Sequence, residues 1–116
     1  MPYQRLLDEL VRHTGAEGAL LLDSEGEVVV EAGAKDERHR LIGAYQGINQ
    51  AAVRRSAHRN MAGSIHYVLY RYAGAAIVLR PLKDGYYLVL SLRPGPAVAV
   101  GVHRSAQVQE RMNAEL

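Results

Sequence analysis

The chain has 116 residues, 48% of them hydrophobic, which predicts a single compact domain over residues 1–116 with its own core. It contains no cysteine, which excludes disulfides, thiolate catalysis and cysteine-ligated metals. No apolar run approaches the roughly 18 residues of a membrane span, so we expect a cytoplasmic protein. The net charge of +2 comes mainly from arginine. It is compatible with an acidic partner but does not by itself indicate nucleic-acid binding.

The first predicted element is an amphipathic helix near the start of the chain. Pro2 suits the first helical turn, and Gly15 suits the position after the last. We expect its apolar stripe to face the core, because the alternative, a membrane-surface helix, needs a more basic polar face. The stripe consists of Tyr3, Leu6, Leu7, Leu10, Val11 and Thr14.

The next stretch, TGAEGALLLDSEGEVVVEAG, contains glycines that suggest a phosphate loop or a hairpin. A phosphate loop needs a strand, then glycines, then a helix whose first amides point at the phosphate. Here Gly15 and Gly18 precede the first apolar run, and Gly26 leads into a β-branched run too short for a helix. The nearby carboxylates also lack the later ligands of an EF-hand. We therefore predict a β-hairpin in which Gly26 adopts a positive φ.

Residues 34–63 predict a long helix, with Asp36 as its N-cap and no proline before Gly63. At about 100° per residue, two apolar lines appear on it, which implies two neighbours: the protein's own sheet and a further surface. The first line is Leu41, Tyr45, Ile48 and Ala52, and the second is Ile42, Val53 and Ala57.

A third arc of the same helix contains two glycines, each of which costs a helix about 1 kcal/mol relative to alanine. We interpret them as positions where another backbone comes close. In the alternative interpretation the glycines arose by sequence drift without a function, in a helix that is stabilised by its packing. The arc consists of Arg40, Gly43, Gly47, Gln50, Arg54 and His58.

Three strands and a closing helix complete the prediction. The sequence Asp84-Gly85 indicates a hairpin turn, and Pro81 fits only a strand end or a sheet edge. The last strand is apolar nearly throughout, as expected at the centre of a sheet. The closing helix is clear from Arg104 onward, while VAVGV before it fits either helix or strand. The predicted strands are Ser64–Tyr72, AAIVLRPL and YYLVLSLRP.

The element order αββαβββα predicts an α+β fold with one mixed or antiparallel five-stranded sheet. The long second helix would lie on one face and the terminal helices on the other. This order, with G-A-x-G-A-L-L-L-D-x-x-G at Gly15–Gly26 and the turn at Asp84-Gly85, resembles the roadblock/dynein light-chain family, whose fold is profilin-like. The resemblance is to its small bacterial members related to the gliding-motility protein MglB.

The resemblance implies a protein that works through protein partners. It implies a homodimer, or a dimer with a paralogous roadblock chain, in which the strand after the long helix pairs with its twin and the long helices lie side by side. It also implies binding to a small Ras-like GTPase, with altered nucleotide hydrolysis or exchange, or an adaptor role. The expected dimer interface is Ile42, Val53, Ala57, Ile65, Tyr67, Val68, Leu69 and Tyr70. The expected GTPase surface is the arc Arg40, Gly43, Gly47, Gln50, Arg54 and His58.

The sequence favours a non-enzymatic protein without catalytic residues, metal or cofactor. Its histidines form no metal-binding pair, its serines lie in no nucleophile elbow, and no Walker loop occurs. Nucleic-acid binding is the main alternative, because Tyr67, Tyr70 and Tyr72 surround Arg71. However, Tyr67 falls on the opposite strand face from the other two, which breaks a stacking platform. A small-molecule sensor is a further alternative.

Overall fold

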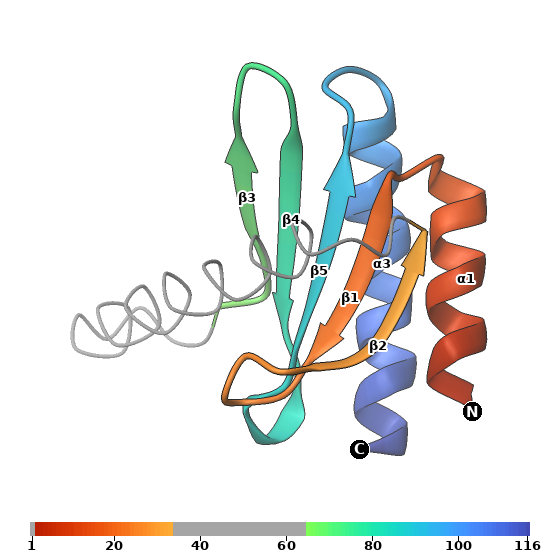
Figure 1. The fold of residues 1–116 in the computed structure, drawn as a ribbon, viewed down its shortest axis with the longest axis vertical. Coiled ribbons are helices and arrows are strands. Elements are labelled where there is room, and N and C mark those ends of the chain that lie inside the picture. Colours follow the sequence, from red (N-terminus) through yellow and green to blue (C-terminus); the bar gives the residue numbers. More distant parts are fainter. Residues whose placement is uncertain (1, 34–64) are drawn as a thin grey trace.

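The structure is a computed structural model that describes residues 2–33 and 65–116. Its strands form one five-stranded sheet of order β2-β1-β5-β4-β3, in which every neighbouring pair is antiparallel (Figure 1). The α+β prediction is therefore confirmed. The elements are α1 (Pro2–Thr14), β1 (Gly18–Leu22), β2 (Val28–Gly33), β3 (Val68–Arg71), β4 (Ala76–Pro81), a 3₁₀ turn (Lys83–Gly85), β5 (Tyr87–Leu92) and α3 (Ala97–Glu115).

The helices α1 and α3 lie side by side on one face of the sheet (Figure 1), as predicted for the terminal helices. Leu7 of α1, Leu21 and Leu90 of the sheet, and Met112 of α3 are completely buried in the core between them. Burial of such side chains stabilises a fold by about 1.5–3 kcal/mol each, so this layer anchors both helices.

The other face of the sheet is equally apolar. Its buried side chains need a covering layer, because an apolar sheet face is stable only against another element. Among the described residues no helix lies on this face. The long helix predicted for it falls within residues 34–64 and lies outside the described residues. The buried side chains of this second face are Leu20, Leu22, Ile77, Leu79, Tyr87 and Val89.

The opening hairpin has the predicted geometry. β1 pairs antiparallel with β2, and Gly26 adopts a φ of 86° in the connecting turn. One carboxylate oxygen of Asp23 accepts hydrogen bonds from the backbone amides of Glu25 and Glu27, at 2.9 and 3.0 Å. The turn thus uses its own amides to bind Asp23, and the interpretation as a hairpin rather than a phosphate loop is confirmed.

The structure also defines the predicted turn at Asp84-Gly85 and the stretch VAVGV, which the sequence left open between helix and strand. Asp84 and Gly85 have φ values of 60° and 81°, which is the conformation expected of a two-residue hairpin turn. The stretch VAVGV is helical, since α3 begins at Ala97. Gly101 explains why a glycine suits that helix: a Cβ there would come within 2.6 Å of the Leu92 side chain. Gly101 therefore lets α3 lie close to β5.

Candidate functional site

The strand β3 forms one edge of the sheet and pairs with β4 in the register Val68↔Leu79 to Arg71↔Ala76 (Figure 1). Tyr72 donates a backbone hydrogen bond to the Ala75 carbonyl at 2.8 Å. Because bonded and non-bonded pairs alternate along an antiparallel ladder, the N–H and C=O groups of Leu69 and Arg71 must point away from β4. No described residue pairs with these outward groups, so this edge of the sheet is open within the described chain.

The strand predicted over Ser64–Tyr72 is longer than the one observed. Of its described part, Ile65–Tyr67 lies outside β3, and Tyr72 begins the turn to β4. The predicted boundary was wrong: the register of β3 and β4 places Pro81, which has no N–H, opposite His66, and the His66 carbonyl accepts a hydrogen bond from the Gln109 side chain at 3.0 Å. An alternating sequence does not reveal such a competing donor.

The described members of the predicted dimer interface lie together along β3 and the segment that leads into it. Tyr67 is exposed, and the others are half-buried, in contrast to the completely buried β5. The side chain of Leu69 packs toward the helices, and that of Tyr70 packs on the second face. The described members are Ile65, Tyr67, Val68, Leu69 and Tyr70. Their role in self-association stays a prediction.

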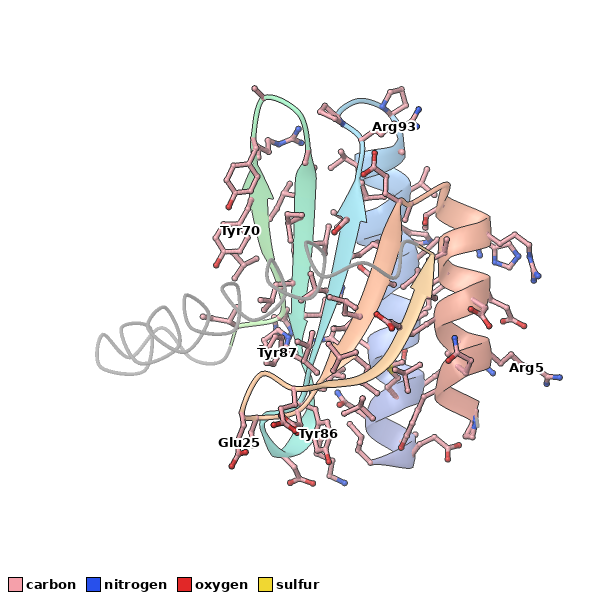
Figure 2. All side chains as sticks on the ribbon, viewed as in Figure 1. Arg5, Glu25, Tyr70, Tyr86, Tyr87 and Arg93 are labelled. Atoms are coloured by element: carbon pink, nitrogen blue, oxygen red, sulfur yellow. The ribbon has the colours of Figure 1, made fainter. Side chains whose placement is uncertain are left out.

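The Tyr70 hydroxyl is buried and forms no hydrogen bond with any residue in 2–33 or 65–116. Burial, followed by the influence of Tyr72, raises the pKa of Tyr70 above its ordinary value. Figure 2 shows Tyr70 on β3, at the outer margin of the sheet. A buried hydroxyl without a partner destabilises a fold by about 1–3 kcal/mol, so a hydrogen bond from outside the described residues would stabilise this position.

The opposite edge of the sheet, β2, is covered. α1 packs along β2, and the Gln4 side chain donates a hydrogen bond to the backbone carbonyl of Glu31 at 2.9 Å. An outward carbonyl of this edge is therefore already satisfied from within the chain. At Glu31, β2 therefore offers a pairing strand one free backbone acceptor fewer than an uncovered edge would.

A buried arginine lies behind the open edge, at a position that no sequence motif singled out. Arg80 is only 4% exposed and donates from Nε to the Ser105 hydroxyl at 2.8 Å and from Nη2 to the Val102 carbonyl at 2.7 Å. Its Nη1 donates to Gln109 Oε1 at 3.0 Å and to the His66 carbonyl at 3.5 Å. The sequence does contain a signal, because Arg80 shares a strand face with the buried Ala76 and Val78.

No carboxylate contacts the Arg80 guanidinium among the described residues. Burial lowers the pKa of Arg80 from its ordinary value, while the neighbouring Tyr67 acts in the opposite direction. The guanidinium carbon lies 4.6 Å from the centre of the Tyr67 ring, a cation–π geometry. This contact occupies one face of Tyr67, which weakens the alternative in which Tyr67 stacks on nucleic acid bases.

Other features of the described chain do not form a chemical site. An open hollow of about 570 Å³ between the start of α1 and the end of α3 is lined by Arg5, Arg111 and Glu115, beside apolar side chains. Over residues 2–33 and 65–116, no group of histidine and acidic side chains is placed to hold a metal ion. The helices found there are too short or too polar to cross a bilayer.

The predicted GTPase surface and part of the predicted dimer interface lie outside the described residues. They remain predictions from the sequence. The positions concerned are Arg40, Gly43, Gly47, Gln50, Arg54 and His58, together with Ile42, Val53 and Ala57.

A model of the Roadblock/LC7 domain matches residues 2–91. The chain is similar in structure to Myxococcus xanthus MglB, with 14% sequence identity over 98% of this chain and 94% of that chain and a TM-score of 0.88. An MglB with a tetrameric arrangement is similar at 24% identity over 98% and 91% of the two chains, with a TM-score of 0.77. Acanthamoeba castellanii profilin IA is similar at 16% identity over 97% and 98%, with a TM-score of 0.61. No curated protein sequence matches the chain.

Proposed function

Since this chain belongs to the Roadblock/LC7 domain family, we propose that it is a non-enzymatic regulator or adaptor that acts through protein partners. The family was predicted from the opening hairpin and the element order, and the match over residues 2–91 confirms it. The similarity to MglB and profilin structures confirms the predicted fold.

The first part of the proposal is self-association through β3. A strand that pairs antiparallel with its own copy forms a symmetric interface, because the same outward groups serve on both sides. The outward groups of Leu69 and Arg71, which have no described partner, are the observation that carries this proposal, and the buried Tyr70 hydroxyl, also without a described partner, adds to it. The tetrameric arrangement of a similar MglB lends further support. A paralogous roadblock chain with a similar edge strand would fit in the same way.

The second part is that the dimer binds a small Ras-like GTPase in the cytoplasm and alters its nucleotide hydrolysis or exchange. The similarity to MglB structures and the predicted arc with Arg40, Gln50 and Arg54 support this partner. The chain itself has no Walker loop, so nucleotide chemistry would belong to the partner. An arginine supplied in trans can accelerate phosphoryl transfer, but nothing singles out one arginine of this chain for that role.

A pull-down with the small Ras-like GTPase of the same organism tests this proposal. The GTPase is loaded either with GDP or with a non-hydrolysable GTP analogue, and we expect clearly more capture in one of the two states. Replacing both Arg40 and Arg54 with glutamate should weaken capture by about tenfold or more, since opposed charges govern specificity at such interfaces. Arg12→Glu, on the exposed side of α1, is the matched control and should bind normally. Absence of capture in both nucleotide states would reject this partner class.

A further inference from the structure

The Arg80 cluster connects three parts of the chain that are far apart in sequence. Arg80 lies on β4, Ser105 and Gln109 lie on α3, and His66 and Tyr67 lead into the edge strand β3. The Gln109 amide nitrogen donates to the carbonyls of His66 and Pro81, at 3.0 and 2.8 Å. One helix side chain thus contacts both the entry to β3 and the end of β4.

The hydrogen bonds of the cluster fall into two groups. Those to Ser105 and Val102 hold the arginine against α3 and do not involve the entry to β3. Those of Arg80 and Gln109 to the His66 carbonyl, with the Tyr67 ring over the guanidinium, hold the entry to β3 itself. The two groups can therefore be separated by substitution.

A buried cation without a carboxylate partner is weak evidence for stability, because apolar side chains of similar volume often pack as well or better. Such groups do, in some proteins, fix one specific arrangement of the chain. The arrangement that Arg80 and Gln109 fix is the path of the backbone at His66, directly before the strand whose outer groups are open.

We propose that Gln109 and Arg80 are positioning residues for the interface strand: they hold the chain at His66–Tyr67 so that β3 is presented for pairing, and they make pairing depend on the position of α3. This inference rests on the proposed self-association through β3. It adds a connection between that interface and a helix on one face of the sheet.

The variant Gln109→Glu tests the positioning role. A glutamate keeps an oxygen for Arg80 and gives the buried cation a carboxylate, but it loses both amide hydrogen bonds, to His66 and to Pro81. Backbone hydrogen exchange is measured at Val68 and Tyr70, whose amides face β4, with β5 as the internal reference for global stability. We expect exchange in β3 to become about tenfold faster relative to β5, since two ordinary hydrogen bonds are lost. The dissociation constant of the dimer should rise by about the same factor.

Two variants serve as controls. Gln107→Glu makes the same chemical change on α3 at an exposed position outside the cluster, and should leave β3 exchange and self-association unchanged. Ser105→Ala removes the acceptor of Arg80 Nε but not the Gln109 contacts. It should speed exchange in β3 and β5 by the same factor.

The outcomes separate this inference from the proposed self-association. Wild-type exchange in β3 with Gln109→Glu, or equal acceleration of β3 and β5, would overturn the positioning role. A wild-type protein that stays monomeric would reject self-association through β3. In that case the exchange ratio between β3 and β5 would still report whether Gln109 holds the strand entry.

Discussion

The two edges of the sheet differ. At one edge α1 packs along β2, and Gln4 donates a hydrogen bond to the Glu31 carbonyl. At the other edge the backbone groups of Leu69 and Arg71 in β3 point outward and have no described partner. Natural proteins usually protect edge strands, because free backbone groups invite pairing with another chain. The difference between the two edges therefore favours β3 over β2 as the strand of the proposed interface.

The largest expected effect comes from Arg71→Pro. The Arg71 amide faces away from β4, so proline there removes no hydrogen bond of the hairpin, but it removes a donor for a partner strand and adds a ring at the edge. A missing donor that leaves a buried acceptor unsatisfied costs about 1–3 kcal/mol, and a symmetric dimer loses this donor on both sides, so self-association should weaken by on the order of a hundredfold. Sedimentation equilibrium measures the change. A dimer of undiminished strength would mean that pairing occurs elsewhere.

The next effect concerns Tyr70→Phe, which removes only the buried hydroxyl. Monomer stability should increase by about 1 kcal/mol, because an unpartnered buried polar group is lost. Dimer affinity should fall, since the partner strand would otherwise supply the missing hydrogen bond. Denaturation in urea at low and high protein concentration distinguishes the two effects. Equal gains at both concentrations would show that the hydroxyl has no partner in the dimer.

The ionisation of Tyr70, on the edge strand β3, should also affect the stability of the fold at alkaline pH. Burial, then Tyr72, raises the folded-state pKa of Tyr70 above the ordinary value of 10.0. A raised pKa contributes stability that is fully present below pH 10 and is lost as the pH rises through the folded pKa. Tyr70→Phe should therefore flatten the loss of stability above about pH 10, as monitored by thermal unfolding across pH. An unchanged slope would show that Tyr70 ionises as freely in the folded state as in the unfolded one.

The smallest effect is expected at the covered edge. Gln4→Ala removes the hydrogen bond to the Glu31 carbonyl and should lower the free energy of unfolding by about 0.5–1.5 kcal/mol. Its dimer dissociation constant should equal that of the wild type, because β2 takes no part in the proposed pairing through β3. Light scattering checks the second point. A weakened dimer would place α1 and β2 at the interface.

The fold was predictable because local signals agreed with each other. Gly26 and Asp84-Gly85 adopt the positive φ values that their turns require, and the apolar run of β5 occupies the centre of the sheet. The terminal helices lie on one face, as the stripe in α1 indicated. Each of these features depends on residues close together in the sequence.

The Arg80 cluster was not predictable in the same way. It needs Arg80, Ser105 and Gln109 to meet across a packed layer, and no spacing in the sequence encodes that contact. Where β3 ends short of the predicted strand, the His66 carbonyl accepts a hydrogen bond from Gln109 of this cluster. The inward position of Arg80 between apolar neighbours was the available sign, and its partners emerge only from the fold.

Hydrogen exchange at the outward amides of Leu69 and Arg71, followed over a range of protein concentrations, tests the central claim most directly. These amides should exchange rapidly in dilute solution and become protected as the concentration rises, while protection in β2 stays constant. Concentration-dependent protection that appears in β2 instead, or at neither edge, would contradict the account of β3 as the interface strand.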